Sequence, residues 1–111
     1  MKMQNGAYSA MQIEWTDPAL EDLENIRDYI AKDSPYYARN FIERIFDTTL
    51  RLEDFPKIGC PVPEAKGRED IRELIFQGYR IIHLLLTDRL QVLAVMHGSQ
   101  NLEGQKTKPW N

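Results

Sequence analysis

The feature that most restricts the fold of this chain is a set of three apolar runs near its C-terminal end, separated by very short turns. The runs span residues 71–76, 79–86 and 90–97 and are rich in Ile, Leu, Val, Tyr and Phe, residue types that favour strands. Only Gln77-Gly78 and Thr87-Asp88-Arg89 separate them. Turns of this length are typical of β-hairpins. The pattern therefore predicts a three-stranded antiparallel meander.

The segment before the meander carries one strand pattern and two helix patterns. Residues 11–15 alternate apolar and polar side chains, which predicts a strand with one buried face. Thr16-Asp17-Pro18 and Ser34-Pro35 are both helix starts, and we expect Asp17 to cap the first helix. Apolar residues recur at helical spacing after each start, and Pro56 is expected to end the second helix at Phe55. Two amphipathic helices joined by a short turn predict an antiparallel helical hairpin.

This order of elements predicts an α+β two-layer fold: an N-terminal strand, a helical hairpin and a three-stranded meander. A chain of 111 residues with 42% hydrophobic residues supports one domain, which we place at residues 11–102. Residues 1–10 are predicted to be a flexible extension and residues 103–111 a flexible tail, because both are polar and lack periodicity. Residues 56–70 contain three prolines and two glycines and are predicted to form a long loop.

The composition excludes several kinds of site. A single cysteine cannot form an internal disulfide, and two histidines form no cluster at metal-ligand spacing, so we expect neither a metal nor a cofactor. No segment has the apolar length of a membrane span or the pattern of a signal peptide, which predicts a cytoplasmic protein. The net charge of -3 is not that of a protein that binds nucleic acid through many phosphate contacts.

Several short strings, taken in order, resemble the RelE/ParE toxin superfamily, whose members are also labelled plasmid stabilisation proteins. These strings are Ile13-Glu14-Trp15-Thr16 leading into Ala19-Leu20-Glu21-Asp22-Leu23, then Ile71-Arg72-Glu73-Leu74, Tyr79-Arg80-Ile81, and Val92-Leu93-Ala94-Val95-Met96-His97-Gly98. The resemblance covers residues 11–102. It implies a toxin that forms a hetero-oligomer with a cognate antitoxin, which wraps over its surface and neutralises it.

The resemblance leaves two activities open, because RelE-like members cleave messenger RNA on the ribosome and ParE-like members poison DNA gyrase. Metal-free RNA cleavage needs a proton acceptor, a cation at the phosphate and a proton donor. Arg80 and His97 match the positions at which RelE-like or related members carry such groups, so they are the candidate catalytic residues under that alternative. Structural roles are open beside these: Arg80 could pair with Glu69, Asp70 or Glu73, and His97 could be a structural histidine at a strand end.

Two features favour the ParE-like alternative, in which the chain catalyses no reaction. Residues 98–101 carry no cation where RelE-like nucleases usually have basic residues, and the chain as a whole is slightly acidic. The candidate partner-binding residues are then Tyr36, Tyr37, Arg39, Arg72, Arg80 and His97. His83, between Ile82 and Leu84, is expected to be a buried structural residue.

A third possibility is an inactive member that only binds its antitoxin. For all three alternatives we expect the antitoxin to add a strand at an exposed sheet edge, and we expect a proline in the last strand to prevent this addition.

Overall fold

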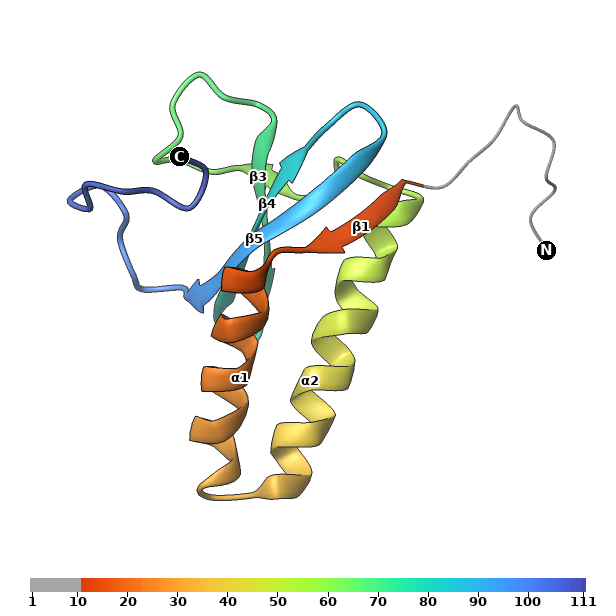
Figure 1. Cartoon of the computed structure of the whole chain (residues 1–111), viewed down its shortest axis with the longest axis vertical. Coiled ribbons are helices and arrows are strands. Elements are labelled where there is room, and N and C mark those ends of the chain that lie inside the picture. The colour runs from red at the N-terminus through yellow and green to blue at the C-terminus, as the bar shows by residue number, and fades with distance from the viewer. Residues whose placement is uncertain (1–10) are drawn as a thin grey trace, which may run out of the picture.

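The computed structural model describes residues 11–111, so the extension predicted for residues 1–10 lies outside the described residues. The elements are β1 (Gln12–Trp15), α1 (Asp17–Ala31), α2 (Pro35–Leu50), a 3₁₀ turn η1 (Arg51–Glu53), β2 (Cys60–Pro61), β3 (Ile71–Phe76), β4 (Tyr79–Leu85) and β5 (Arg89–His97). The predicted α+β class and the order of strand, helical hairpin and meander are confirmed (Figure 1). No helix in residues 11–111 is long and apolar enough to cross a membrane.

The sheet has five strands in the order β1-β5-β4-β3-β2. Strands β3, β4 and β5 form the predicted antiparallel meander, with Phe76 opposite Tyr79 at its first turn. Strand β1 pairs with β5 in parallel and β2 pairs with β3 in antiparallel, over two residues only. Strand β5 is therefore flanked on both sides over residues 89–92, where a proline would disrupt the sheet itself rather than test an exposed edge. The expectation that β5 offers an exposed edge is therefore wrong for residues 89–92, and beyond them the Val95 N–H donates to the Asp22 carboxylate.

The helix starts are confirmed, but the cap of α1 is Thr16 rather than Asp17. The Thr16 hydroxyl accepts from the Ala19 N–H and donates to the Val92 carbonyl at 2.9 Å, so the same side chain caps α1 and attaches it to β5. Ser34 caps α2 by accepting from the Tyr37 N–H. Helix α2 ends at Leu50 instead of continuing to Phe55, because the chain tightens into η1 and turns Leu52 into the core.

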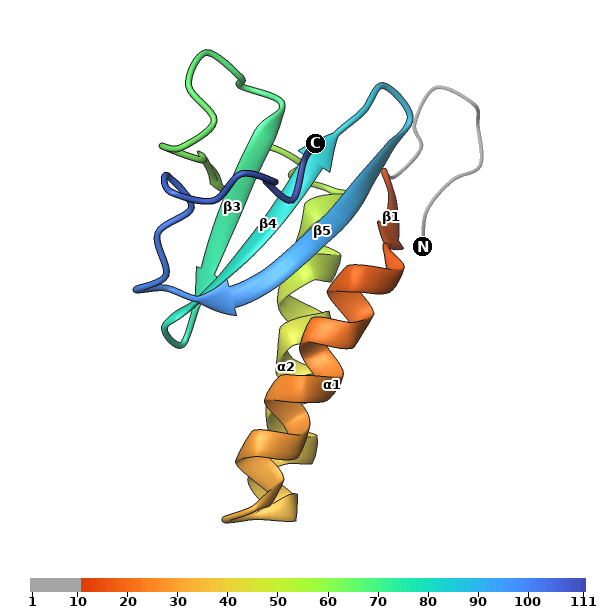
Figure 2. The same ribbon diagram turned by 60° about the vertical axis from the view of Figure 1, so that its left-hand side comes forward.

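Each face of the sheet has its own apolar cluster. The helices cover one face, where Leu23, Phe41, Ile45 and Leu52 pack against strand residues such as Ile81 and Val92. On the opposite face, Ile71, Ile82 and Ala94 pack beneath Val62 and Ala65 of the long loop and beneath Leu102, which follows β5. Figure 2 shows the C-terminal segment crossing this second face, and Trp110 packs against the cluster there. The flexibility predicted for residues 103–111 stays a prediction.

Candidate functional site

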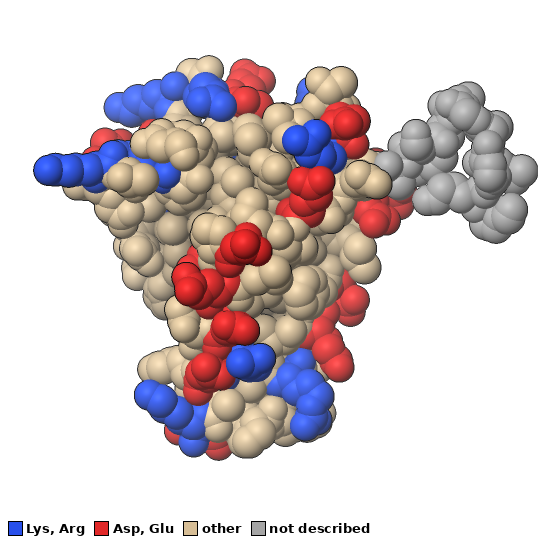
Figure 3. Space-filling view, in the orientation of Figure 1, with Lys and Arg blue, Asp and Glu red and all other residues tan. Residues whose placement is uncertain are grey.

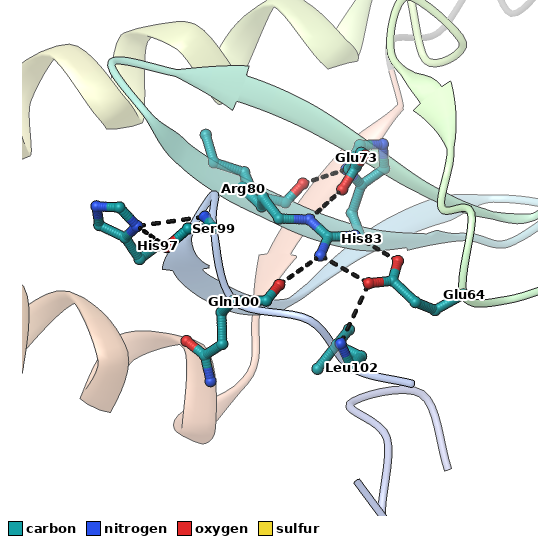
Figure 4. A network of polar contacts seen from close by, with 9 residues as sticks. Glu64, Glu73, Arg80, His83, His97, Ser99, Gln100 and Leu102 are labelled. Carbon is teal, nitrogen blue, oxygen red and sulfur yellow. Dashed lines mark hydrogen bonds and ion pairs between the residues drawn. The ribbon is translucent and has the colours of Figure 1, made fainter. Parts of the chain in front are cut away.

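Arg80 is the second residue of β4 and its guanidinium lies at the centre of a polar network on the second face of the sheet (Figure 4). Its Nε donates to the Glu73 carboxylate at 2.7 Å. Its two Nη atoms donate to the two Glu64 oxygens at 3.0 and 2.7 Å, and one of them also donates to the Gln100 carbonyl at 3.0 Å. Only 6% of Arg80 is exposed. This cation is therefore enclosed by two carboxylates.

Three separate parts of the chain supply the partners of Arg80. Glu73 lies on the neighbouring strand β3, Glu64 comes from the long loop before β3, and Gln100 follows β5. The Leu102 N–H also donates to Glu64 at 3.2 Å. The Arg80 hydrogen bonds lower the pKa of Glu64 to about 2, and the same bonds raise the pKa of Arg80. Both groups therefore stay charged at neutral pH, and the network fastens the loop and the C-terminal segment to the sheet.

The pairing of Arg80 agrees only in part with the sequence analysis. Glu73, one of the three expected partners, is confirmed, whereas Asp70 pairs with Arg68 instead at 2.9 Å. Glu64 was missed because it lies in an irregular, proline-rich loop whose path no periodicity predicts. The only local signal was its place in a loop long enough to fold back over the sheet.

An open hollow of about 490 Å³ lies over this network. Its charged lining residues are Glu64, Glu73, Glu103 and Arg80, so the carboxylates outnumber the cations. On the face shown in Figure 3, Asp and Glu side chains run diagonally from the upper right toward the lower left, and Lys and Arg gather mainly at the upper left and at the lower end. The hollow is therefore poorly suited to a phosphate backbone, which needs an excess of positive charge.

His97 lies on the other face of the sheet from Arg80. Strand register places Arg80 opposite Met96 and Tyr79 opposite His97, and successive side chains of a strand point to opposite faces. The His97 ring packs edge-on against Tyr79 with centroids 5.6 Å apart, and its Nδ1 lies 2.8 Å from the Ser99 hydroxyl. Figure 4 shows this ring directed toward Ser99 and away from the Arg80 guanidinium. The structure does not bring the two candidate catalytic residues together.

The remaining candidates lie at two further places. Tyr36 and Tyr37 lie in the first turn of α2, at the end of the helical hairpin. Tyr36 is 65% exposed and Tyr37 is 64% exposed, and Arg39 is exposed in the same turn. Arg72 lies on β3, and its Nη atoms donate to the carbonyls of Lys57, Gly59 and Glu69, so it anchors the start of the long loop. The partner-binding roles of these four residues stay predictions. In Arg72 both Nη atoms are already used in hydrogen bonds within the fold.

His83 is fully buried, in agreement with the sequence analysis. Its Nδ1 lies 3.3 Å from the Ile81 carbonyl, and desolvation lowers its pKa to about 4. The imidazole is therefore neutral near pH 7. In residues 11–111, His, Cys, Asp and Glu side chains form no group of three or more that could hold a metal ion.

The structure thus packs a helical hairpin on an antiparallel meander, with Tyr79 and Arg80 at the start of β4. The sequence model described as "ParE toxin of type II toxin-antitoxin system, parDE" matches residues 13–102. This chain belongs to the ParE toxin family, within the RelE/ParE superfamily.

Individual relatives agree with this assignment. The chain is 34% identical over 94 residues to "Putative toxin Y4kP" of Sinorhizobium fredii, covering 83% of this chain and 93% of that protein. It is 29% identical over 90 residues to "Toxin RelE2" of Caulobacter vibrioides, covering 80% and 97%. Its fold is similar to that of a chain in "Chromosomal ParDE TA system from P. aeruginosa", with a TM-score of 0.65, 21% identity and coverage of 79% and 96%.

Proposed function

We propose that this chain is a ParE-like toxin that inhibits DNA gyrase in the cytoplasm, and that a cognate antitoxin holds it inactive in a hetero-oligomeric complex. Membership of the ParE toxin family supports a toxin with an antitoxin partner.

The observation that carries the choice of gyrase over messenger RNA is the state of Arg80. A guanidinium that binds a scissile phosphate must be free to reach it, but Arg80 is 6% exposed and bonded to two carboxylates at 2.7 Å. His97 lies on the opposite face and could not act on the same phosphate group. An acidic hollow and two separated candidate groups favour a protein surface as the target rather than RNA.

The antitoxin is proposed to add a strand to the open edge of β3. Strand β2 pairs only with Arg72 and Glu73, so the backbone of Ile75 lies beyond its reach. Phe76 pairs with Tyr79 across a two-residue turn, so the backbone groups of Arg72, Leu74 and Phe76 bond to β4. The N–H and C=O of Ile75 therefore point away from β4, to the open side of β3. An exposed edge of this kind is a template for strand addition.

Induced expression of the wild-type chain without antitoxin tests the target. Growth, DNA-damage signalling and messenger RNA integrity should be read in one culture, with supercoiling by purified gyrase assayed in parallel. We expect growth arrest with DNA damage, intact transcripts and inhibited supercoiling. Transcript cleavage without inhibition of gyrase would reject the proposal in favour of a ribonuclease, and the absence of arrest would identify a member that only binds its antitoxin.

His97→Ala separates the two mechanisms because this exposed side chain can be removed without opening the core. Removal of a general acid or base lowers a cleavage rate by about 100-fold or more. Loss of one exposed contact should change gyrase inhibition at most several-fold. A variant that arrests growth as the wild type does therefore supports the gyrase proposal.

A further inference from the structure

A second hollow, of about 360 Å³, lies between the helical hairpin and the turn that joins β3 to β4. It is lined by Ile30 of α1, by Tyr37, Asn40, Phe41 and Arg44 of α2, and by Gln77 of the turn. Its lining includes one cation and no carboxylate. It shares no lining residue with the hollow over Arg80, and it differs in charge because three glutamates line that other hollow.

The polar side chains of this hollow are not used within the fold. Arg80 and Arg89 pair with carboxylates, whereas the Arg44 guanidinium makes no ion pair or hydrogen bond within residues 11–111. The side-chain amides of Asn40 and Gln77 also have no hydrogen bond within this described part of the chain. Donors that the protein leaves free at one hollow can be given to a ligand.

The backbone of Gln77 gives an independent sign that this side chain has a use. Its φ of 49° lies in the left-handed region, and Gly78 follows with a φ of 85°. A two-residue turn with both φ angles positive favours Gly or Asn, because Cβ lies too close to the following carbonyl oxygen there, a cost that glycine avoids and that Asn offsets by local hydrogen bonding. Residue 77 is thus held in a strained conformation that glycine would relieve, while glycine would remove an amide from the hollow.

We propose that this hollow binds the carboxylate of an Asp or Glu side chain presented by a protein partner. The planar fork of Arg44 matches a carboxylate through two parallel hydrogen bonds, and the Asn40 and Gln77 amides can donate from its sides. Ile30 and Phe41 provide an apolar wall for the methylene groups of the incoming side chain. A phosphate backbone fits less well because the hollow offers a single cation in a chain of net charge -3. The inference rests on the proposed function only in taking the partner to be a protein.

Titration of the ¹⁵N-labelled full chain tests the inference directly. The probe is the capped tripeptide acetyl-Ala-Glu-Ala-amide, and its control is the same peptide with glutamine in place of glutamate. We expect the glutamate peptide to shift the Arg44 Nε–H and the Asn40 and Gln77 amide signals saturably, with a Kd of roughly 1 mM, a typical scale for so few contacts. The glutamine peptide should bind at least tenfold more weakly. Equal affinities, or no saturable shift with the glutamate peptide, would refute a carboxylate site.

Two variants and two further anions complete the test. Arg44→Gln should abolish the shifts of the Asn40 and Gln77 amides, whereas Arg51→Gln, at an exposed arginine outside the hollow, should leave them unchanged. Gln77→Gly should keep or raise the urea midpoint of unfolding while weakening the peptide several-fold; unchanged affinity would remove Gln77 from the site. Tighter binding of inorganic phosphate than of acetate at the same signals would overturn the choice of a protein carboxylate. The peptide titration does not involve gyrase, so a failure of the carboxylate site and a failure of the gyrase proposal can be told apart.

Discussion

Arg80, a candidate catalytic residue under the ribonuclease alternative, lies at the centre of a buried polar network. Its guanidinium reaches carboxylates on β3 and in the long loop and a carbonyl after β5, so it connects segments that are not neighbours in the sequence. A buried charge of this kind is strongly favourable only while its partners stay in place, since an unpaired ion in a dry site is costly. The network therefore predicts a large effect when one partner is removed.

Glu64→Gln should lower the free energy of unfolding by about 2 kcal/mol, because Arg80 would keep only one of its two carboxylates. Glu69→Gln is the matched control: this glutamate is exposed, and the change should cost less than about 0.5 kcal/mol. Urea denaturation at pH 7 measures both. The low pKa of Glu64, about 2, means that its contribution is present above its ordinary pKa near 4.5 and is lost as the pH falls toward 2. Equal losses in the two variants would show that the buried pair adds no stability.

His83 should make the stability depend on pH in a different range. Its pKa is lowered from 6.5 to about 4 in the folded chain, so below pH 6.5 the unfolded chain takes up a proton that the folded chain does not. The free energy of unfolding should therefore fall between pH 6.5 and 4, by up to roughly 3 kcal/mol. Urea titrations across this range should show that His83→Leu removes this slope, whatever its stability at pH 7. An unchanged slope would assign the effect to other groups.

At the scale of the elements, the position of β5 determines where the sheet is open. Strand β5 lies between β1 and β4 over residues 89–92, and the end of β3 beyond Glu73 has no strand partner on its outer side. Proline substitutions should distinguish the two strands, since proline removes one donor and is tolerated only where that donor has no partner.

Ile75→Pro should leave a cooperatively folded chain, because the Ile75 N–H points to the open side, whereas Ala94→Pro in β5 should abolish cooperative unfolding. Thermal unfolding by circular dichroism measures this difference. In a binding assay with the cognate antitoxin, Ile75→Pro should weaken the complex, and Ile75→Thr, which retains the N–H, should not. Normal binding by a folded Ile75→Pro chain would exclude strand addition at this edge.

At the scale of the whole molecule, the chain covers both faces of its sheet with its own residues. The helices cover one face, and the long loop and the C-terminal segment cover the other, where Leu102 is fully buried and Trp110 packs against the same cluster. The described residues 103–111 thus contact the core through Trp110, although their composition alone favours a mobile tail.

Trp110→Ala should lower the free energy of unfolding by about 1 to 2 kcal/mol, because a partly buried indole gains only part of the stabilisation that full burial of its apolar surface would give. In a Trp15→Phe background, Trp110 becomes the only tryptophan, and its emission should be blue-shifted in the folded chain and shift to the red in urea. Emission typical of a solvated indole, together with unchanged stability, would support the mobile tail instead.

Much of the fold could be predicted because its signals are local. Alternating apolar residues, two helix caps each followed by proline, and turns of two and three residues act over a few positions. They were sufficient to predict the helical hairpin and the meander, and the buried His83. The same local signals could not predict that Thr16 rather than Asp17 caps α1, because the choice depends on the Val92 carbonyl across the sheet.

The sequence by itself determined the class of elements, their order and the family to which the chain belongs. Only the tertiary structure decided that β1 joins β5 in parallel, that Glu64 reaches Arg80, and that Arg80 and His97 occupy opposite faces. The physical reason is that pairing between distant segments depends on register and on how loops fold back over the sheet. These depend on packing over the whole chain rather than on any short stretch of it.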